Sequence, residues 1–265
     1  MTRDTIIITT PPQTLRSVQG WDVTPGHLAY RVGRGPHLFR AGGGTVQPRG
    51  GIMVVDDQGF DGLGDPGPLC QEVVRECSAR GFTGAVLDFD AKLPPLERMA
   101  ATLEEGFARR GWTLYVPESY GARLQRARVM ISSALSGGSL ALRLEEASGC
   151  FGADRVALAL QRVAEDFALP SSTGDGQPLT REELAQKRRQ MNPSVFFSGE
   201  LCARYFTYMN REGGAHFVLF DDGDTLRRKM EVARRAGIHT FLAAWPEVAD
   251  CVEQLGLQRA QSRAR

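Results

Sequence analysis

The chain repeats one pattern of polar and apolar positions three times: a helix with a single apolar face, a basic last turn, a glycine and a short apolar strand. The junctions at 79–83, 108–113 and 233–240 lead into the strands 84–90 (GAVLDFD), 114–118 (LYVPE) and 241–245 (FLAAW). Basic side chains complement the negative end of a helix, and glycine takes the left-handed position that ends it. Short apolar strands between one-sided helices predict a parallel sheet covered by helices.

Other short apolar runs extend this pattern in both directions. They lie at 27–32, 37–40, 52–55, 128–132 and 155–160, and at 195–197 and 216–220, which flank 205–210 as a hairpin-like excursion. An open doubly wound sheet fits such a pattern, but the even spacing of the units and the absence of a GxGxxG turn favour a barrel. We therefore expect an α/β fold, a (β/α)8 TIM-like barrel that is irregular over its N-terminal fifth. Its expected parts are an N-terminal segment at 1–51, a barrel core at 52–258 and a basic tail at 259–265.

Capping residues mark the ends of several expected helices. Pro94 and Pro95 suit the first turn of one helix, and Asp224 suits the N-cap of the last long helix. Thr180 and Glu183 have the spacing of a capping box that opens a helix at 181–190.

Composition narrows the classes of partner and compartment. The chain has 265 residues, 42% of them hydrophobic, and a net charge of +1, which fits one large domain with no overall attraction to nucleic acid. It has neither a signal-peptide h-region nor the ~20 apolar residues of a membrane span, so we expect a cytoplasmic location or export by a non-classical route. Five cysteines without CxxC spacing predict buried thiols rather than a metal site, and no cofactor is expected.

Acidic residues recur where the expected strands end. They are Asp56, Asp57, Asp88, Asp90, Glu118 and Glu247. In a barrel these ends converge on one face, and carboxylates brought together raise one another's pKa. Because Asp88 and Asp90 are two apart on one strand, we expect both to face the mouth while Phe89 faces the helices. The alternative is that each acid caps the next helix or lies in solvent.

The segment 83–90 (TGAVLDFD) resembles the signature of family 18 glycoside hydrolases, Asp-Gly-x-Asp-x-Asp-x-Glu, on the fourth barrel strand. Gly84 and Asp88 match that signature. Thr83 and Val86 replace two of its aspartates, and Asp90 stands where the family has its catalytic glutamate. The resemblance implies that Asp88 orients the substrate's 2-acetamido group and that Asp90 is the acid.

Later segments keep the order of the same family. The strand at 129–133 and the glycine-rich loop at 136–139 resemble its sixth strand and following loop, with Ser132 and Ser133 in place of a Tyr-Asp pair. Trp245 falls where the family keeps a tryptophan under the sugar, although a place in the barrel floor fits it equally well. In all, the likeness covers roughly residues 52–250.

The resemblance implies a substrate that contains β-linked N-acetylglucosamine, as an oligosaccharide or a polysaccharide. Tyr115, Tyr120 and Trp245 are the candidates for stacking on sugar rings, and Ser132, Ser133 and Asp56 are further candidate contacts. Catalysis in this family is assisted by the substrate's acetamido group. The side chain of Asp90 is shorter than glutamate by one methylene, which leaves Glu118 as the candidate for a relocated acid.

Three functions stay open on the sequence alone. The chain is a glycoside hydrolase, or a catalytically inactive barrel that binds a glycan or scaffolds an assembly. The third reading is an unrelated barrel enzyme whose acidic cluster holds Mg²⁺ or Mn²⁺.

Overall fold

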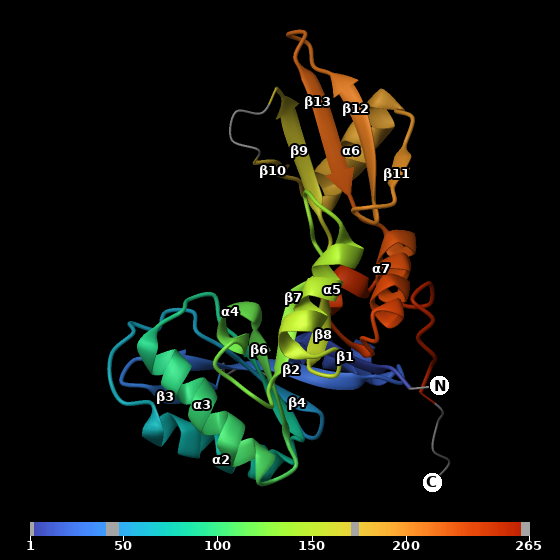
Figure 1. Cartoon of the computed structure of the whole chain (residues 1–265). Coiled ribbons are helices and arrows are strands. Elements are labelled where there is room, and N and C mark those ends of the chain that lie inside the picture. The colour runs from blue at the N-terminus through green and yellow to red at the C-terminus, as the bar shows by residue number, and fades with distance from the viewer. Residues whose placement is uncertain (1–2, 41–47, 171–174, 261–265) are drawn as a thin grey trace.

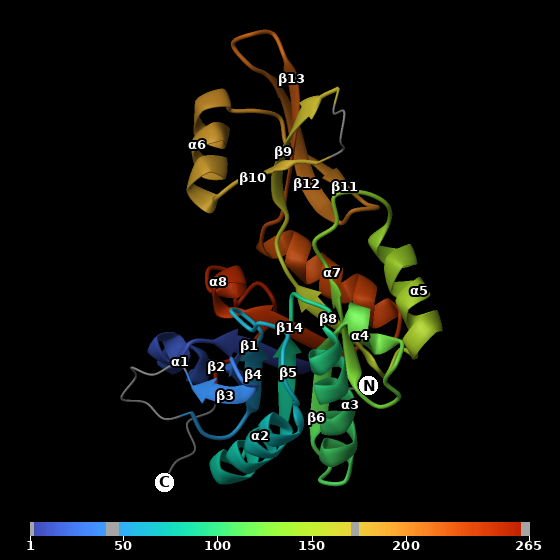
Figure 2. The same cartoon turned by 90° about the vertical axis from the view of Figure 1, so that its left-hand side faces the viewer.

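Eight parallel strands close into a barrel in the computed structural model, which describes residues 3–40, 48–170 and 175–260 (Figures 1 and 2). The barrel strands are β1 (Thr5–Thr10), β2 (Thr24–Gly33), β4 (Ile52–Asp56), β5 (Gly84–Asp88), β6 (Thr113–Pro117), β7 (Arg128–Ser132), β8 (Val156–Leu160) and β14 (Thr240–Ala244). Closure comes from β1, which pairs in parallel with both β2 and β14. The expected (β/α)8 barrel is confirmed. Residues 261–265 of the expected basic tail lie outside the described residues.

Helices lie between the strands and cover the outside of the barrel. They are the 3-10 helix η1 (Pro12–Thr14) and the α-helices α1 (Leu15–Gln19), α2 (Gly67–Arg80), α3 (Pro94–Ala108), α4 (Glu118–Gly121), α5 (Leu140–Phe151), α7 (Gly223–Arg235) and α8 (Trp245–Val248). A further strand, β3 (His37–Arg40), pairs antiparallel with the second half of β2. The N-terminal fifth therefore supplies two barrel strands, of which β1 was not predicted from the sequence.

The repeated junction glycines adopt the conformation expected of them. Gly81, Gly111 and Gly237 have φ angles of 68°, 68° and 78°, in the left-handed region that a side chain disfavours. One cap differs from expectation, because the N-cap of α7 is Asp222 and Asp224 lies in the first turn. The Asp222 carboxylate accepts from the Thr225 amide at 3.0 Å, which satisfies a free N–H of the first turn.

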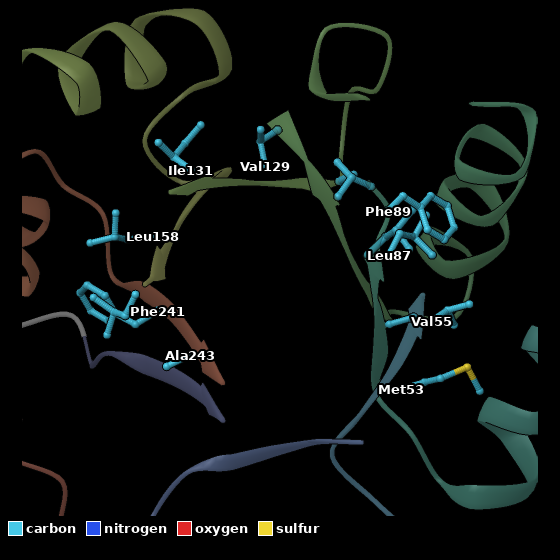
Figure 3. Packing of buried hydrophobic residues seen from close by; sticks show 14 of the residues in the cluster. Met53, Val55, Leu87, Phe89, Val129, Ile131, Leu158, Phe241 and Ala243 are labelled. Atoms are coloured by element: carbon cyan, nitrogen blue, oxygen red, sulfur yellow. The ribbon is translucent and has the colours of Figure 1, made fainter. Parts of the chain in front are cut away.

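Successive residues along each barrel strand belong alternately to two apolar clusters. Side chains in the first, such as Met53, Val55 and Leu87, point outward from the ring of strands toward the helices (Figure 3). Intervening strand positions form a second cluster inside the barrel, made of Ile7, Ile52, Val54, Val86, Tyr115, Ala157 and Leu242. This period of two along each strand fixes which side chains can reach the barrel mouth.

An inserted subdomain stands above the barrel between β8 and α7 (Figures 1 and 2). Its antiparallel sheet has the order β10-β9-β13-β12-β11. The elements are β9 (Ala164–Leu169), β10 (Gln177–Pro178), β11 (Phe196–Ser198), β12 (Ala203–Met209), β13 (Ala215–Phe220) and the helix α6 (Arg181–Met191). The expected hairpin and the capping box of α6 are confirmed, whereas β9 and β10 were not predicted.

Four of the five cysteines are buried, as expected, and Cys150 is exposed on α5. In the described part of the chain no helix has the length and apolarity needed to cross a bilayer.

A fully buried ion pair joins the inserted subdomain to the barrel. Lys229 of α7 and Asp221, at the end of the insertion, lie 2.6 Å apart with no solvent exposure of either side chain. Lys229 Nζ also donates to the Ser133 carbonyl at 2.8 Å, and Asp221 accepts from the Val163 amide at 2.9 Å and the Thr225 hydroxyl at 2.7 Å. This pair is therefore the point at which the two ends of the insertion meet helix α7 and the loop that follows β7.

Removing one member of this pair leaves an uncompensated buried charge. We expect Lys229→Met to lower the free energy of unfolding by about 3–5 kcal/mol, the usual cost of breaking such a pair. Arg227→Met is the matched control on the same helix, because Arg227 forms exposed ion pairs with Glu231 and Asp224, each of which contributes roughly 0.3–0.5 kcal/mol. Urea denaturation of both variants measures the difference. Equal losses would contradict the role given to Lys229.

Candidate functional site

A cavity of about 180 Å³ opens at the mouth of the barrel, where the strands end. Its walls come from six strands and the segments after them, and the polar side chains among them are Thr9, Asp88, Gln161 and Glu247. Apolar residues of the barrel interior, including Val54, Val86 and Leu242, form the rest of the lining. We call this space the mouth cavity.

Asp88 is the last residue of β5 and carries the unpaired carboxylate of the mouth cavity. It follows the alternation that directs Val86 inward, while Phe89 packs among buried residues outside the barrel. Asp88 is exposed to solvent at the mouth, but partial loss of hydration there raises its pKa, and the negative charges of Asp90, Asp56 and Asp57 raise that pKa further. Within the described residues no cation pairs with Asp88, so nothing offsets these effects.

Asp57 fixes the turn after β5. Its buried carboxylate accepts from the amides of Asp90 at 3.1 Å and Ala91 at 2.9 Å. Asp90 is thereby held just beyond the strand with an exposed side chain, whose carboxylate has no hydrogen bond or ion pair within the described residues. Asp56 closes its own turn by accepting from the Gln58 amide at 3.0 Å. Asp57 is thus a positioning residue that the sequence identified only as one of several acids at strand ends.

Ser132 and Ser133 both contact Gln161, at the end of the neighbouring strand. Ser132 donates its hydroxyl proton to Gln161 Oε1 at 2.6 Å. Ser133 is fully buried. Its hydroxyl donates to the main-chain carbonyl of Gln161 and accepts from the main-chain N–H of Gln161, both at 3.0 Å. Ser133 therefore ties β7 to β8 instead of facing the cavity. The polar side chain presented there is that of Gln161, which the sequence analysis did not identify.

Glu118 does not line the mouth cavity. It is the first residue of α4, and its carboxylate forms an ion pair with Arg143 of α5. Glu247 does line the cavity, and it accepts from the Arg162 amide at 3.0 Å. Of the acids expected at strand ends, Asp88 and Glu247 are therefore the two that the structure brings to this space.

The candidate aromatic residues also lie outside the cavity lining. Tyr115 is buried inside the barrel. Tyr120 packs edge-to-face on Phe89 at 5.9 Å and donates to the Ala91 carbonyl at 2.5 Å. Trp245 is half-buried and packs against the cluster outside the barrel. Stacking of Trp245 on a sugar, which we predicted from the sequence, stays a prediction.

A metal site is not evident in the described ranges. Among residues 3–40, 48–170 and 175–260, no group of three or more His, Cys, Asp or Glu side chains is placed to hold an ion.

No protein-family model matches the chain, and no curated protein matches its sequence. The fold is similar to that of a chitinase from Chromobacterium violaceum ATCC 12472, with a TM-score of 0.67 and 12% identity over 97% of this chain and 100% of that one. The Bacillus cereus spore cortex-lytic enzyme SleL gives a TM-score of 0.66 and 14% identity over 96% and 75%. A GH18 chitinase from Cycas revoluta in complex with (GlcNAc)3 gives 0.58 and 11% over 94% and 97%.

These similarities confirm the expected likeness to family 18 glycoside hydrolases at the level of the fold. The chain has a (β/α)8 barrel similar to the barrels of these chitinases. Because the identities are so low, the chemistry of the mouth has to be argued from its own residues.

The raised pKa of Asp88 predicts that this residue destabilises the folded protein when ionised. When a carboxyl group has a higher pKa in the folded than in the unfolded state, the free energy of unfolding of the protein falls as pH rises from the unfolded pKa toward the folded one. For an aspartate this fall starts near the unfolded value of ~3.9. We therefore expect Asp88→Asn to be more stable than wild type at pH 7, with the gain disappearing below about pH 4. Thermal melts across pH test this, with Asp154→Asn, an exposed change on the turn before β8, as the control. A loss of stability at pH 7 would contradict it.

Proposed function

We propose that the barrel mouth binds a β-linked N-acetylhexosamine glycan and hydrolyses it very slowly or not at all. The observation that carries the proposal is Asp88, an unpaired carboxyl group of raised pKa that lines the mouth cavity. Perturbed carboxyl groups in clefts are typical of binding and catalytic sites. The fold shared with chitinases supports a glycan as the ligand.

The dimensions and polarity of the mouth cavity suit one end of such a ligand. At about 180 Å³ it is smaller than the pockets of roughly 300–1,000 Å³ that enclose whole small molecules. Asp88 can accept from a sugar hydroxyl or amide, and the NH2 group of Gln161 is a donor for an acetamido carbonyl. Apolar side chains such as Met130 and Leu242 offer contacts for a methyl group or a ring face.

Three features support slow hydrolysis. The acid position is Asp90, whose carboxyl is one methylene (~1.5 Å) short of a glutamate, and errors of about 1 Å can cost on the order of 100-fold in rate. Ser132 and Ser133 have neither the phenol nor the carboxylate that the family places there, and both are engaged with Gln161. Glu118, the alternative acid, is paired with Arg143 away from the cavity.

The catalytically inactive glycan binder is therefore preferred over the active hydrolase. A metal-dependent barrel enzyme receives no support from the described residues, because no group of potential ligands is gathered there.

Calorimetric titration with N-acetylglucosamine oligomers tests the binding. We expect the wild type to bind a tetramer, and Asp88→Ala to weaken that binding by at least tenfold, which is about 1.4 kcal/mol. Asp154→Asn, far from the mouth at the opposite end of β8, is expected to bind as wild type. No heat of binding at millimolar sugar would remove the glycan proposal.

The hydrolysis assay separates a weakened enzyme from an inert binder. Wild type is expected to turn over far more slowly than the ~10 per second of an ordinary enzyme. Asp90→Glu restores the missing methylene and is expected to cleave the tetramer faster than wild type, whereas Asp90→Asn is expected to keep binding without any gain. Turnover by wild type near 10 per second would show that Asp90 already suffices as the acid.

A further inference from the structure

A groove of about 410 Å³ lies between α2 and α3, which are neighbours on the outside of the barrel (Figures 1 and 2). Small and apolar residues line one part of it, among them Cys70, Val74, Leu103 and Gly106. A Cβ atom added at Gly106 would have its nearest neighbours at 4.0 Å, so the groove is open there to a side chain from outside. We call this surface the α2–α3 groove.

Three arginines complete the lining of the α2–α3 groove, and no carboxylate belongs to it. Arg75 is exposed and forms no ion pair with a described residue. Arg110 donates to the Gly106 carbonyl at 2.8 Å and likewise has no carboxylate partner in the described part of the chain. Arg109 reaches Glu105 at 4.0 Å, in an exposed pair of the kind that contributes little.

The carboxylates that come near this groove along α2 are already bound to other groups. Glu72 binds two groups of β3, at 2.7 and 3.0 Å, and Glu76 accepts from the Tyr30 hydroxyl of β2 at 2.9 Å. Asp65, just before α2, accepts from the Gly67 amide at 3.3 Å. Positive charge is therefore in excess in the α2–α3 groove.

Helix α5 exposes a stripe with the opposite character. Leu142 is 59% exposed, and Glu145, Glu146 and Gly149 follow it at the spacings of three, four and seven residues that place side chains on one helix face. Neither glutamate forms a hydrogen bond or an ion pair with a described residue. A Cβ atom added at Gly149 would meet nothing within 4 Å. We call these four residues the α5 stripe.

The order of apolar and charged residues is the same on both surfaces. Cys70 and Leu103 lie on earlier turns of α2 and α3, and Arg75 and Arg109 lie on later turns. Because both helices follow parallel strands, the apolar residues lie toward one end of the groove and the arginines toward the other. On α5 the exposed leucine likewise precedes the two glutamates.

The two surfaces of one chain cannot meet each other. Helix α5 follows β7, whereas α2 and α3 follow β4 and β5, and β6 lies between them in the barrel. The α5 stripe can therefore reach only the α2–α3 groove of another molecule.

We propose that the α2–α3 groove binds the α5 stripe of a second copy of this chain. Leu142 enters the apolar part, and Glu145 and Glu146 pair with the arginines, whose guanidinium groups match carboxylates in geometry. Because the two surfaces differ, the contact is head-to-tail and builds a ring or an open chain of copies rather than a twofold dimer. Neither surface includes a residue that lines the mouth cavity, so each copy keeps its mouth open.

Sedimentation velocity of the wild-type protein tests the association. Between about 10 and 500 μM, a range that suits a small and weak interface, we expect the average mass to rise with concentration and to pass that of a dimer. We expect 1 M NaCl to weaken the association, because the Debye length falls from ~10 Å at 0.1 M to ~3 Å. A monomer throughout this range at low salt would overturn the proposal.

Two double variants, each with one damaged surface, test the pairing itself. Glu145→Lys with Glu146→Lys places like charges against the groove, and Arg75→Gln with Arg109→Gln removes the positive charge from it. Each variant alone is expected to lose at least about tenfold in self-association. An equimolar mixture is expected to form a 1:1 complex and nothing larger, because one intact groove and one intact stripe remain.

Arg98→Gln is the matched control, since Arg98 is an exposed arginine of α3 outside the α2–α3 groove. It is expected to associate as wild type. Variants that self-associate as wild type, a mixture that stays monomeric, or an equal loss in Arg98→Gln would each overturn the pairing. Glycan binding, measured separately, is expected to be unchanged in both double variants, so failure of this proposal leaves the proposed function in place.

Discussion

The buried pair of Lys229 and Asp221 is the interaction on which the geometry of the barrel mouth and of the inserted subdomain depends. Two charges without solvent are tolerated because they pair with each other and bond to neighbouring groups, Lys229 to the Ser133 carbonyl and Asp221 to the Val163 amide and the Thr225 hydroxyl. Lys229 holds the carbonyl of Ser133, whose hydroxyl in turn holds the backbone of Gln161, a wall of the mouth cavity. Asp221 itself lines a second cavity, of about 340 Å³, beside the mouth. The position of the inserted subdomain and the shape of the mouth are thus set by one network.

The parts of the fold that could be predicted are those with a local signal. A basic last turn, a left-handed glycine and an apolar run lie within about ten residues of one another, so β5, β6 and β14 could be read from the sequence alone. No described residue before β1 belongs to a helix, and its partner β14 lies more than 200 residues away. Its pairing is a property of barrel closure, which no local pattern contains.

The directions of site residues could be predicted from the sequence where those residues lie on a strand. The period of two directs Asp88 inward with Val86, and this follows from the sequence once β5 is recognised. Beyond the ends of the strands, side chains no longer alternate between the two faces. Glu118 and Trp245 are the first residues of short helices, so their directions depend on how α4 and α8 begin. Gln161 escaped notice because an uncharged residue after a strand carries no signal of its own.

Most carboxylates at the strand ends stabilise the fold, and this sets Asp88 and Asp90 apart. Asp57 holds two amides, Asp221 a buried lysine and Glu118 an arginine. Asp88 faces other carboxylates and has no counter-ion among the described residues, which raises its pKa. A carboxyl group in the barrel mouth that makes no structural bond is better explained by what binds there than by the architecture around it.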